Sequence, residues 1–185
     1  GYSQPFNDIN QDRLDSLGWD VVRRPTGGRA ILHTDELTYA VIGPKTDQRL
    51  QGGLLESYRQ LSRALYESLL LLSLPVEIHQ GKNPLANQQP VCFENPSDFE
   101  ITVNGKKIIG SAQARKKQAL LQHGSLPLEG DLTRITQVLN YQTSQEQADA
   151  ATTLLDKATT VAQTLGYKIT WKDAANAFIA GFSKI

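Results

Sequence analysis

Residues 99–109 read FEITVNGKKII, and this stretch decides how the centre of the chain folds. Apolar and polar residues alternate from Phe99 to Val103, as is typical of a β-strand with one buried face. Asn104 and Gly105 follow as an Asn-Gly pair, the strongest short signal for a two-residue hairpin turn. The sequence therefore predicts a β-hairpin whose second strand runs over residues 106–109.

Before this hairpin, the pattern predicts three more strands and a long helix. Residues 19–24, 37–42 and 76–79 are short β-prone runs. Between the last two, apolar residues recur at helical spacing over residues 54–72, which predicts a helix with one face against a sheet. Pro75 is expected to stop that helix.

After the hairpin, residues 119–128 predict a further strand. Apolar residues share one helical face over residues 143–165, and Gly166 is typical of a helix end. Thr170 begins a capping-box pattern that opens another helix. This order predicts an α+β fold, a mixed β-sheet packed with helices on one side, and leaves an α/β arrangement open.

Composition suits one globular domain and argues against several function classes. The chain has 185 residues, 39% of them hydrophobic and 21% charged, enough to bury a core. Its 19 basic residues balance 19 acidic ones, so no nucleic-acid partner is expected. No apolar run approaches the roughly 18 residues that a membrane span needs, and no signal peptide is visible.

The cysteine and histidine counts bound the redox setting and the metal chemistry. A single cysteine excludes an internal disulfide and favours a reducing, cytoplasmic setting. His33, His79 and His123 lie far apart without ligand-like spacing, so no metal site is expected.

Residues 23–33, RRPTGGRAILH, combine two arginines with a paired-glycine turn and a histidine. Glycine lets a backbone approach a ligand closely, and arginines add fixed positive charge at the same place. Such a segment can cradle a carboxylate, phosphate or acyl group against exposed amides. The alternative is a tight turn between strands with solvated arginines.

Four segments together resemble one known family. Residues 23–33, 91–94, 98–115 and 121–125 resemble the lipoate–protein ligase and octanoyltransferase superfamily, whose fold is related to that of biotin–protein ligase. Within it, the chain is most similar to the cysteine-dependent octanoyl-[carrier protein] transferases. The resemblance covers residues 1–128, with weaker similarity over residues 170–182. It implies one acyltransferase domain over residues 1–185 that lacks N- and C-terminal segments of the family.

The resemblance implies two catalytic residues. Cys92, which follows the polar stretch 80–90, matches the nucleophile of the similar transferases. Lys107 matches a lysine that holds the acyl carbonyl oxygen and stabilises charge developing there. Strand alternation alone puts Lys106 and Lys107 on opposite faces without telling which enters a site. The plainer interpretations are a small buried cysteine and an exposed hairpin lysine.

The remaining expected site residues would shape the substrate pocket. The small residues after Lys107 would form a floor for the acyl chain, and the histidines would line the site rather than act as bases. The predicted substrate-binding residues are Arg23, Arg24, Thr26, Gly27, Gly28, His33, Gly110, Ser111, Ala112, Gln113, His123 and Gly124.

The resemblance implies transfer of an octanoyl group in lipoate biosynthesis. The donor would be octanoyl-acyl carrier protein, and the acceptor a lysine of a lipoyl domain or of the glycine cleavage H protein. Neither metal nor ATP would be needed. A rival is an ATP-dependent lipoate–protein ligase, which would need ATP and Mg²⁺; Arg29, where such enzymes carry a third glycine, disfavours it. Other rivals are an amidotransferase between lipoyl domains and an inactive lipoyl-domain-binding protein.

Overall fold

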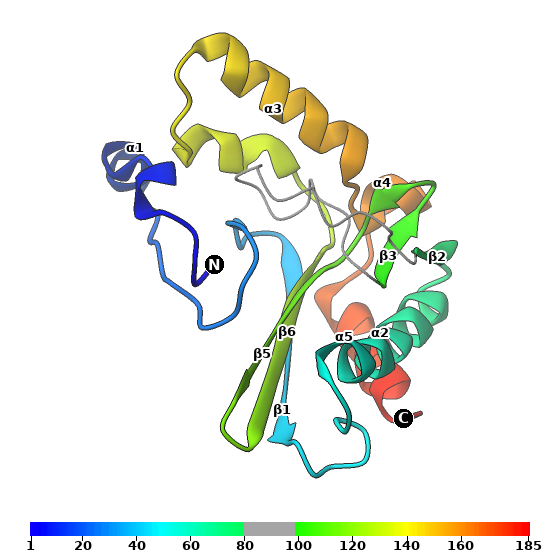
Figure 1. Cartoon of the computed structure of the whole chain (residues 1–185). Helices are drawn as coiled ribbons and strands as arrows, with labels where there is room; N and C mark the ends of the chain where they lie inside the picture. Colours follow the sequence, from blue (N-terminus) through cyan, green and yellow to red (C-terminus); the bar gives the residue numbers. More distant parts are fainter. Residues whose placement is uncertain (80–98) are drawn as a thin grey trace.

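A computed structural model describes residues 1–79 and 99–185 (Figure 1), and its described strands form two antiparallel three-stranded sheets. The larger sheet has the order β1-β6-β5, and the smaller sheet has the order β2-β3-β4. The strands are β1 (Glu36–Pro44), β2 (Val76–His79), β3 (Glu100–Val103), β4 (Lys106–Lys107), β5 (Gly110–Lys116) and β6 (Ala119–Pro127).

Helices surround the sheets, and most begin at a side-chain cap. Asn10, Thr143, Thr160 and Thr170 each accept a hydrogen bond from a main-chain amide of the helix that they open. The helical elements are η1 (Phe6–Asp8), α1 (Gln11–Leu17), α2 (Leu54–Leu71), η3 (Leu132–Val138), α3 (Ser144–Lys157), α4 (Val161–Leu165) and α5 (Trp171–Phe182). None of the helices in residues 1–79 and 99–185 combines the length and apolarity needed to cross a bilayer.

The main core lies between both sheets and the helix pair α2 and α5, which run side by side in Figure 1. Leu65 and Leu69 of α2 and Phe178 of α5 are buried there. The rings of Tyr39, Phe178 and Phe182 pack together between β1 and α5, with ring centroids 5.9 to 6.3 Å apart. The order of apolar residues in the sequence therefore places one face of the larger sheet against α2 and α5.

The two faces of the larger sheet have different neighbours. Because side chains alternate along a strand, Tyr39, Gln122 and Ser111 point toward α2 and α5, and we call this the helix face. The opposite face, here called the site face, carries Glu36, Ala40, Ala112, His123 and Ser125 in the same registers.

The predicted α+β class is confirmed, and most predicted elements are present. The helix over residues 54–72, the strands over 37–42, 76–79 and 119–128, and the hairpin at Asn104 and Gly105 all form. The helix ends at Leu71, before the expected stop at Pro75. All named strands pair antiparallel; a parallel pairing among the described residues is the isolated bridge between Lys107 and Ala158.

Three predicted elements were wrong. Residues 19–24 form no strand. This segment lies against the N-terminal residues, where the Arg23 side chain donates to the carbonyls of Gly1, Tyr2 and Gln4. The returning strand stops at Lys107, and residues 110–116 form a separate strand that was not predicted. The helix over residues 143–165 is two helices, because Ala158 is extended and Thr160 starts a new capping box.

Candidate functional site

The arginine-glycine segment folds as a loop against the site face. Thr26 is fully buried, and its Oγ1 lies 2.7 Å from Nε2 of His123 on β6. Gly28 has φ +90°, a conformation that favours glycine, and Arg24 donates to the carbonyl of Arg29 at 2.9 Å to close the turn. The structure thus brings the predicted loop residues to the predicted strand residue His123.

His33 follows this loop and is held by a carboxylate. Its Nδ1 is hydrogen-bonded to one oxygen of Glu36, and Ser125 donates its hydroxyl to the other oxygen. Glu36 is nearly buried, whereas His33 is about half exposed. The hydrogen bond that the Glu36 carboxylate accepts raises the pKa of His33 above its ordinary value.

The environment of His123 has the opposite effect. Partial burial lowers the pKa of His123, and the positive charge of Arg24 acts in the same direction. Arg24 also lies near enough to His33 to oppose its protonation. Two histidines on the same face therefore have pKa values displaced in opposite directions.

Lys107 is a buried lysine with a buried carboxylate partner. The residue is 6% exposed, and its Nζ forms an ion pair with Glu100 on the adjacent strand. Lys106 points the other way, and its Nζ donates to the carbonyl of Leu155 at 2.6 Å. Lys107 therefore lies on the polar face of β3 and β4, together with Glu100 and Thr102.

Main-chain hydrogen bonds and strand pairing hold β4 and the start of β5. The carbonyl of Lys107 accepts a hydrogen bond from the amide of Thr159 at 3.0 Å, which holds β4 in place. Three residues later, Gly110 begins β5 directly opposite Ser125. Ser125 in turn bonds Glu36, the partner of His33.

The predicted floor, residues 110–113, divides between the two faces of the sheet. Gly110 and Ala112 share the site face with His123. Ser111 lies on the helix face, where its hydroxyl is 2.6 Å from that of Tyr39. Gly124 also faces this side, because a Cβ there would meet the Tyr39 ring at 2.6 Å.

Gln113 belongs to a polar network beneath the sheet. Its amide donates to Gln122 at 2.9 Å and accepts from Ser57 of α2 at 3.1 Å. Gln122 in turn donates to Tyr39 at 3.2 Å, and burial raises the pKa of Tyr39 to about 12. Ser111 and Gln113 therefore hold β5 against α2, which leaves Gly110 and Ala112 as the site-facing residues of this set.

A cavity of about 600 Å³ opens beside the loop and His123. Arg23, Arg24, His33 and His123 line its polar part. Its apolar lining comes from Phe6, Ile9, Leu14, Trp19, Val21, Val22, Ala30, Ile31, Leu32, Ile135, Val138 and Leu139. Such a mixed lining suits a ligand with an apolar chain and one polar end. Cys92, the predicted nucleophile, and the stretch 80–90 lie outside the described residues.

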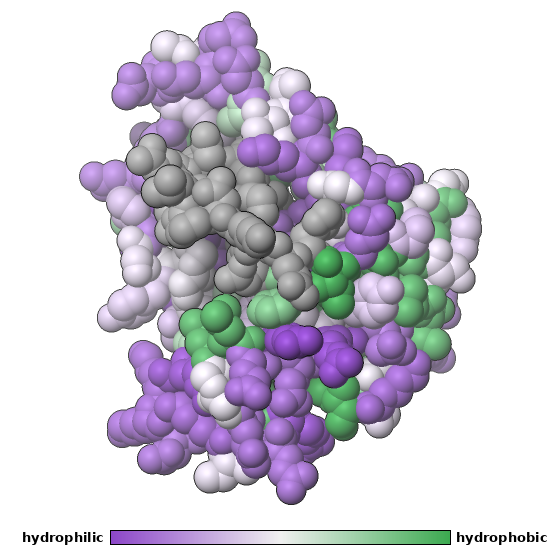
Figure 2. All heavy atoms as spheres, turned by 45° about the vertical axis from the view of Figure 1, so that its right-hand side comes forward, coloured by the Kyte–Doolittle hydropathy of each residue, from purple (hydrophilic) through white to green (hydrophobic). Residues whose placement is uncertain are grey.

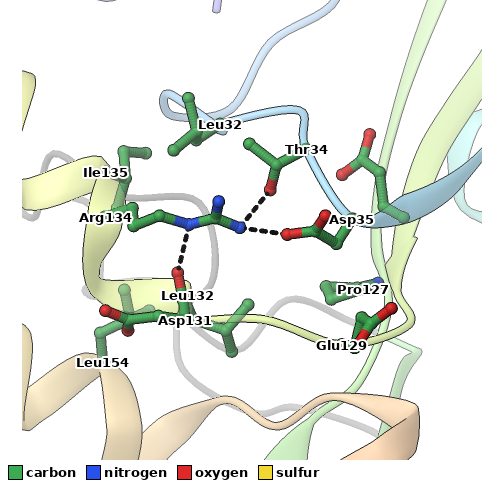
Figure 3. A pocket seen from close by; sticks show the side chains of 11 residues that line it. Leu32, Thr34, Asp35, Pro127, Glu129, Asp131, Leu132, Arg134, Ile135 and Leu154 are labelled. Atoms are coloured by element: carbon green, nitrogen blue, oxygen red, sulfur yellow. Dashed lines mark hydrogen bonds and ion pairs between the residues drawn. The ribbon is translucent and has the colours of Figure 1, made fainter. Parts of the chain in front are cut away.

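A smaller hollow of about 30 Å³ shows how the His33 segment is anchored (Figure 3). Arg134 of η3 donates to Thr34 at 2.9 Å, forms an ion pair with Asp35, and donates to the carbonyl of Asp131 at 3.1 Å. These contacts fix the two residues between His33 and Glu36. Within residues 1–79 and 99–185, no group of three His, Cys, Asp or Glu side chains could hold a metal ion.

Glu36, Glu100 and Ser125 are site residues that sequence reasoning missed. Glu100 carried a usable signal, because a strand that places Ile101 in the core puts Glu100 on the same side as Lys107. Glu36 and Ser125 carried none, because their contact joins residues 89 positions apart.

Comparison with known proteins identifies the family. Residues 1–183 match the family described as the lipoyl protein ligase A/B catalytic domain. The chain belongs to this family.

Curated relatives in the family carry one name. The chain is 37% identical over 185 residues to octanoyltransferase LipM of Carboxydothermus hydrogenoformans, covering 100% of this chain and 68% of that protein. It is 34% identical over 190 residues to octanoyltransferase LipM of Symbiobacterium thermophilum, covering 100% of this chain and 69% of that protein. The chain therefore spans about two thirds of the length of these relatives.

Solved structures agree on the fold. A bi-partite lipoate protein ligase from Thermoplasma acidophilum superposes with a TM-score of 0.79 at 23% identity, covering 100% of this chain and 65% of that one. Lipoate-protein ligase A bound with ATP gives 0.76 at 24% identity, covering 100% and 66%. The predicted lipoate ligase-like fold is confirmed.

Proposed function

We propose that this chain is the catalytic domain of an octanoyltransferase that acts in lipoate biosynthesis. The donor is octanoyl-acyl carrier protein, and the acceptor is a lysine of a lipoyl domain or of the glycine cleavage H protein. The similarity to proteins named octanoyltransferase covers 98–100% of this chain at 33–37% identity, and it supports this function. The enzyme acts in the cytoplasm and needs neither ATP nor a metal.

Transfer proceeds in two covalent steps. The thiol of Cys92 gives up its proton and its sulfur attacks the thioester carbonyl of the donor, whose carrier thiolate leaves and takes a proton. The nitrogen of the neutral acceptor amine then attacks the acyl-cysteine, a C–N bond forms and the C–S bond breaks. One nitrogen proton passes to the departing sulfur, which restores the thiol of Cys92. Dividing the transfer in this way replaces one difficult step by two easier ones.

Lys107 is the observation that carries the proposal. A buried ammonium on β4 of the smaller sheet is suited to hold a carbonyl oxygen as it gains negative charge. Glu100 keeps this side chain extended in one position before substrate binds. A lysine on the opposite face, such as Lys106, has no comparable enclosure.

The cavity supplies the second support. A slot that is apolar over most of its lining and polar at Arg24, His33 and His123 suits an octanoyl chain with its carbonyl at the polar part.

Intact mass spectrometry tests the function. The protein is mixed with octanoyl-acyl carrier protein without ATP, beside a Cys92→Ala variant. We expect a hydroxylamine-sensitive octanoyl adduct on the unmodified chain alone. No adduct, followed by acylation of a lipoyl domain only with ATP and free octanoate, would instead identify an ATP-dependent ligase. Binding of a lipoyl domain without acylation under either condition would identify an inactive binding protein.

A further inference from the structure

The part of the site face beyond His123 is an exposed apolar surface. Strand pairing places two further rows of residues there, toward the β5–β6 turn, at the end of the sheet away from α3 in Figure 1. Ile42 on this surface is 75% exposed, whereas its neighbour Val41 points to the helix face and packs against buried leucines. We call this surface the outer face, and it consists of Ile42, Pro44, Ala114, Lys116, Ala119 and Leu121.

Positive charge borders the outer face on two sides. Lys116 belongs to its last row, and Lys45 and Lys117 lie beside it at the turn, where the ammonium of Lys45 donates to the carbonyl of Lys117. On the side toward the cavity, Arg23 and Arg24 donate their guanidinium protons to main-chain carbonyls. A carbonyl satisfies these donors without cancelling their charge.

The positive charge of this border is not neutralised locally. No acidic side chain within residues 1–79 and 99–185 forms an ion pair with the three lysines or the two arginines of the border. Arg49, near the turn, is paired with Asp47 and adds no net charge. Asp20 is the acidic residue that the described part of the chain contributes to the cavity lining. The border as a whole is therefore cationic.

The outer face is continuous with the cavity of about 600 Å³. His123 lines the cavity and precedes the row that contains Ile42 and Leu121. Tyr2 joins the two groups of cations, because its carbonyl accepts a hydrogen bond from Arg23 at 2.9 Å and its ring centroid lies 5.8 Å from Nζ of Lys116. A partner seated on the outer face would therefore lie at the edge of the cavity.

We propose that the outer face docks the acyl carrier protein that donates the octanoyl group, an inference that rests on the proposed function. A carrier protein is a small acidic protein, and its carboxylates are complementary to the cationic border. The exposed apolar centre supplies the contact area that such an interface needs. The arm that holds the acyl group contains a phosphodiester, an anion that lysine and arginine bind through charge-assisted hydrogen bonds.

Two other occupants fit this surface less well. Along β6, the four residues from Ala119 to His123 span about 13 Å at roughly 3.3 Å per residue. A lipoyl domain docked at the turn would leave its lysine short of the cavity, whereas the long arm of a carrier protein covers that distance. A second copy of this chain would bring two cationic borders together, and like charges repel.

Carrier binding is the test. The probe is octanoyl-acyl carrier protein with an amide in place of the thioester, which cannot transfer its acyl group, and calorimetry gives the Kd. Lys116→Glu should raise the Kd on the order of 10-fold, because it sets a negative charge against an acidic partner. Ile42→Thr, which keeps a β-branched side chain on the strand, should raise it several-fold. Added salt should weaken binding to the unmodified chain.

Matched controls lie on α5, which covers the opposite face of the sheet. Lys172→Glu and Ile179→Thr make the same two changes at exposed residues there, and both should leave the Kd unchanged.

Acyl-enzyme formation separates docking from chemistry. With octanoyl-acyl carrier protein as donor, Lys116→Glu should raise KM on the order of 10-fold, as it does the Kd. With the octanoyl thioester of N-acetylcysteamine, which has no carrier protein, the variant should react at the unmodified rate. That second rate also shows that the variant is folded.

An unchanged Kd in both Lys116→Glu and Ile42→Thr would overturn the inference while leaving the octanoyltransferase function intact. So would an equal loss of affinity for a lipoyl domain, which would assign the outer face to the acceptor. A dimer that Ile42→Thr converts to a monomer would assign it to a second copy instead. An unmodified chain that forms no acyl-enzyme with either thioester would remove the proposed function and this inference with it.

Discussion

At the scale of single residues, the site depends on charged side chains that are held in low-dielectric surroundings. Lys107 and Glu100 are both about 6% exposed, and their ion pair offsets part of the cost of burying each charge. A buried pair of this kind adds little net stability, yet removing one partner is costly because the other charge remains buried. The pair therefore fixes position more than it stabilises the fold.

Lys107→Met should lower the free energy of unfolding by roughly 3–5 kcal/mol, since it leaves Glu100 buried without its ion partner. Lys106→Met, the matched change one residue away, should cost less than about 1 kcal/mol, because Lys106 is not buried. Urea unfolding measures both. Adding Glu100→Leu to Lys107→Met should restore stability without restoring acyl-enzyme formation. Equal losses in the two single variants would contradict the buried pair.

Prediction from sequence at this scale succeeded where a residue's neighbours lie close in the chain. Lys107 was singled out through the resemblance alone, and its catalytic role stays a prediction. Alternation put Lys106 and Lys107 on opposite faces, and the structure bears this out. Glu36 and Ser125 could not be predicted, because a carboxylate and a hydroxyl acquire a role only when the fold joins them. The role of Cys92 stays a prediction.

At the scale of elements, α2 and α5 meet through a glycine. A Cβ on Gly181 would lie 2.8 Å from the main chain of both Ala64 and Ser68 on α2. The absence of a side chain lets the two helices approach closely, which brings Phe178 and Phe182 onto Tyr39. The helix face of the sheet, and with it the polar network around Gln122, depends on this contact.

Gly181→Ala should destabilise the protein by about 1–3 kcal/mol, because the added methyl group forces α5 away from α2. Gly53→Ala is the control: it precedes α2, has φ −73° and has open space around it. Its cost should stay within a few tenths to about 1 kcal/mol. Thermal unfolding of both variants decides the matter, and an unchanged midpoint for Gly181→Ala would argue against the close contact.

Element prediction failed where tertiary contacts outweighed local pattern. Residues 19–24 have the composition of a strand, but they pair with no other strand. The guanidinium of Arg23 instead donates hydrogen bonds to the carbonyls of Gly1 and Gln4. The spacing of apolar residues predicted one helix through Ala158, although the helix ends there. An alanine gives no signal in the sequence for the extended main chain that Ala158 adopts. Capping residues gave the reliable boundaries, as at Thr143 and Thr170.

At the scale of the whole molecule, segments distant in sequence enclose the cavity. Arg23 holds the main chain of Gly1, Tyr2 and Gln4, and the amide of Tyr2 bonds the carbonyl of Thr26 at 2.9 Å.

Several large side chains stay exposed on the side that carries α2, β2 and α5 (Figure 2), among them Leu71, Ile78 and Ile179.

Arg23→Ala should release the first residues from the cavity without unfolding the sheets, because three hydrogen bonds to that segment depend on one side chain. Hydrogen–deuterium exchange should rise by an order of magnitude or more at Tyr2 and Gln4, as expected when opening becomes local. Exchange in β6 should not change. Arg63→Ala on the exposed side of α2 is the control, and similar exchange in both variants would show that Arg23 does not hold the segment.

The pairing of Ile9 with Leu139 constrains the order in which the chain can fold during synthesis. The amide of Asn10 bonds the carbonyl of Val138, and the amide of Asn140 bonds that of Asp8, so α1 is docked by residues made much later. A nascent chain on the ribosome cannot close this contact until the polypeptide beyond residue 140 has left the exit tunnel. The apolar wall that Ile9 and Leu139 build together therefore cannot form before all the strands from β1 to β6 have been synthesised. Until then the β1–β6 pairing stands with one flank of the ligand cavity open to solvent and to chaperones.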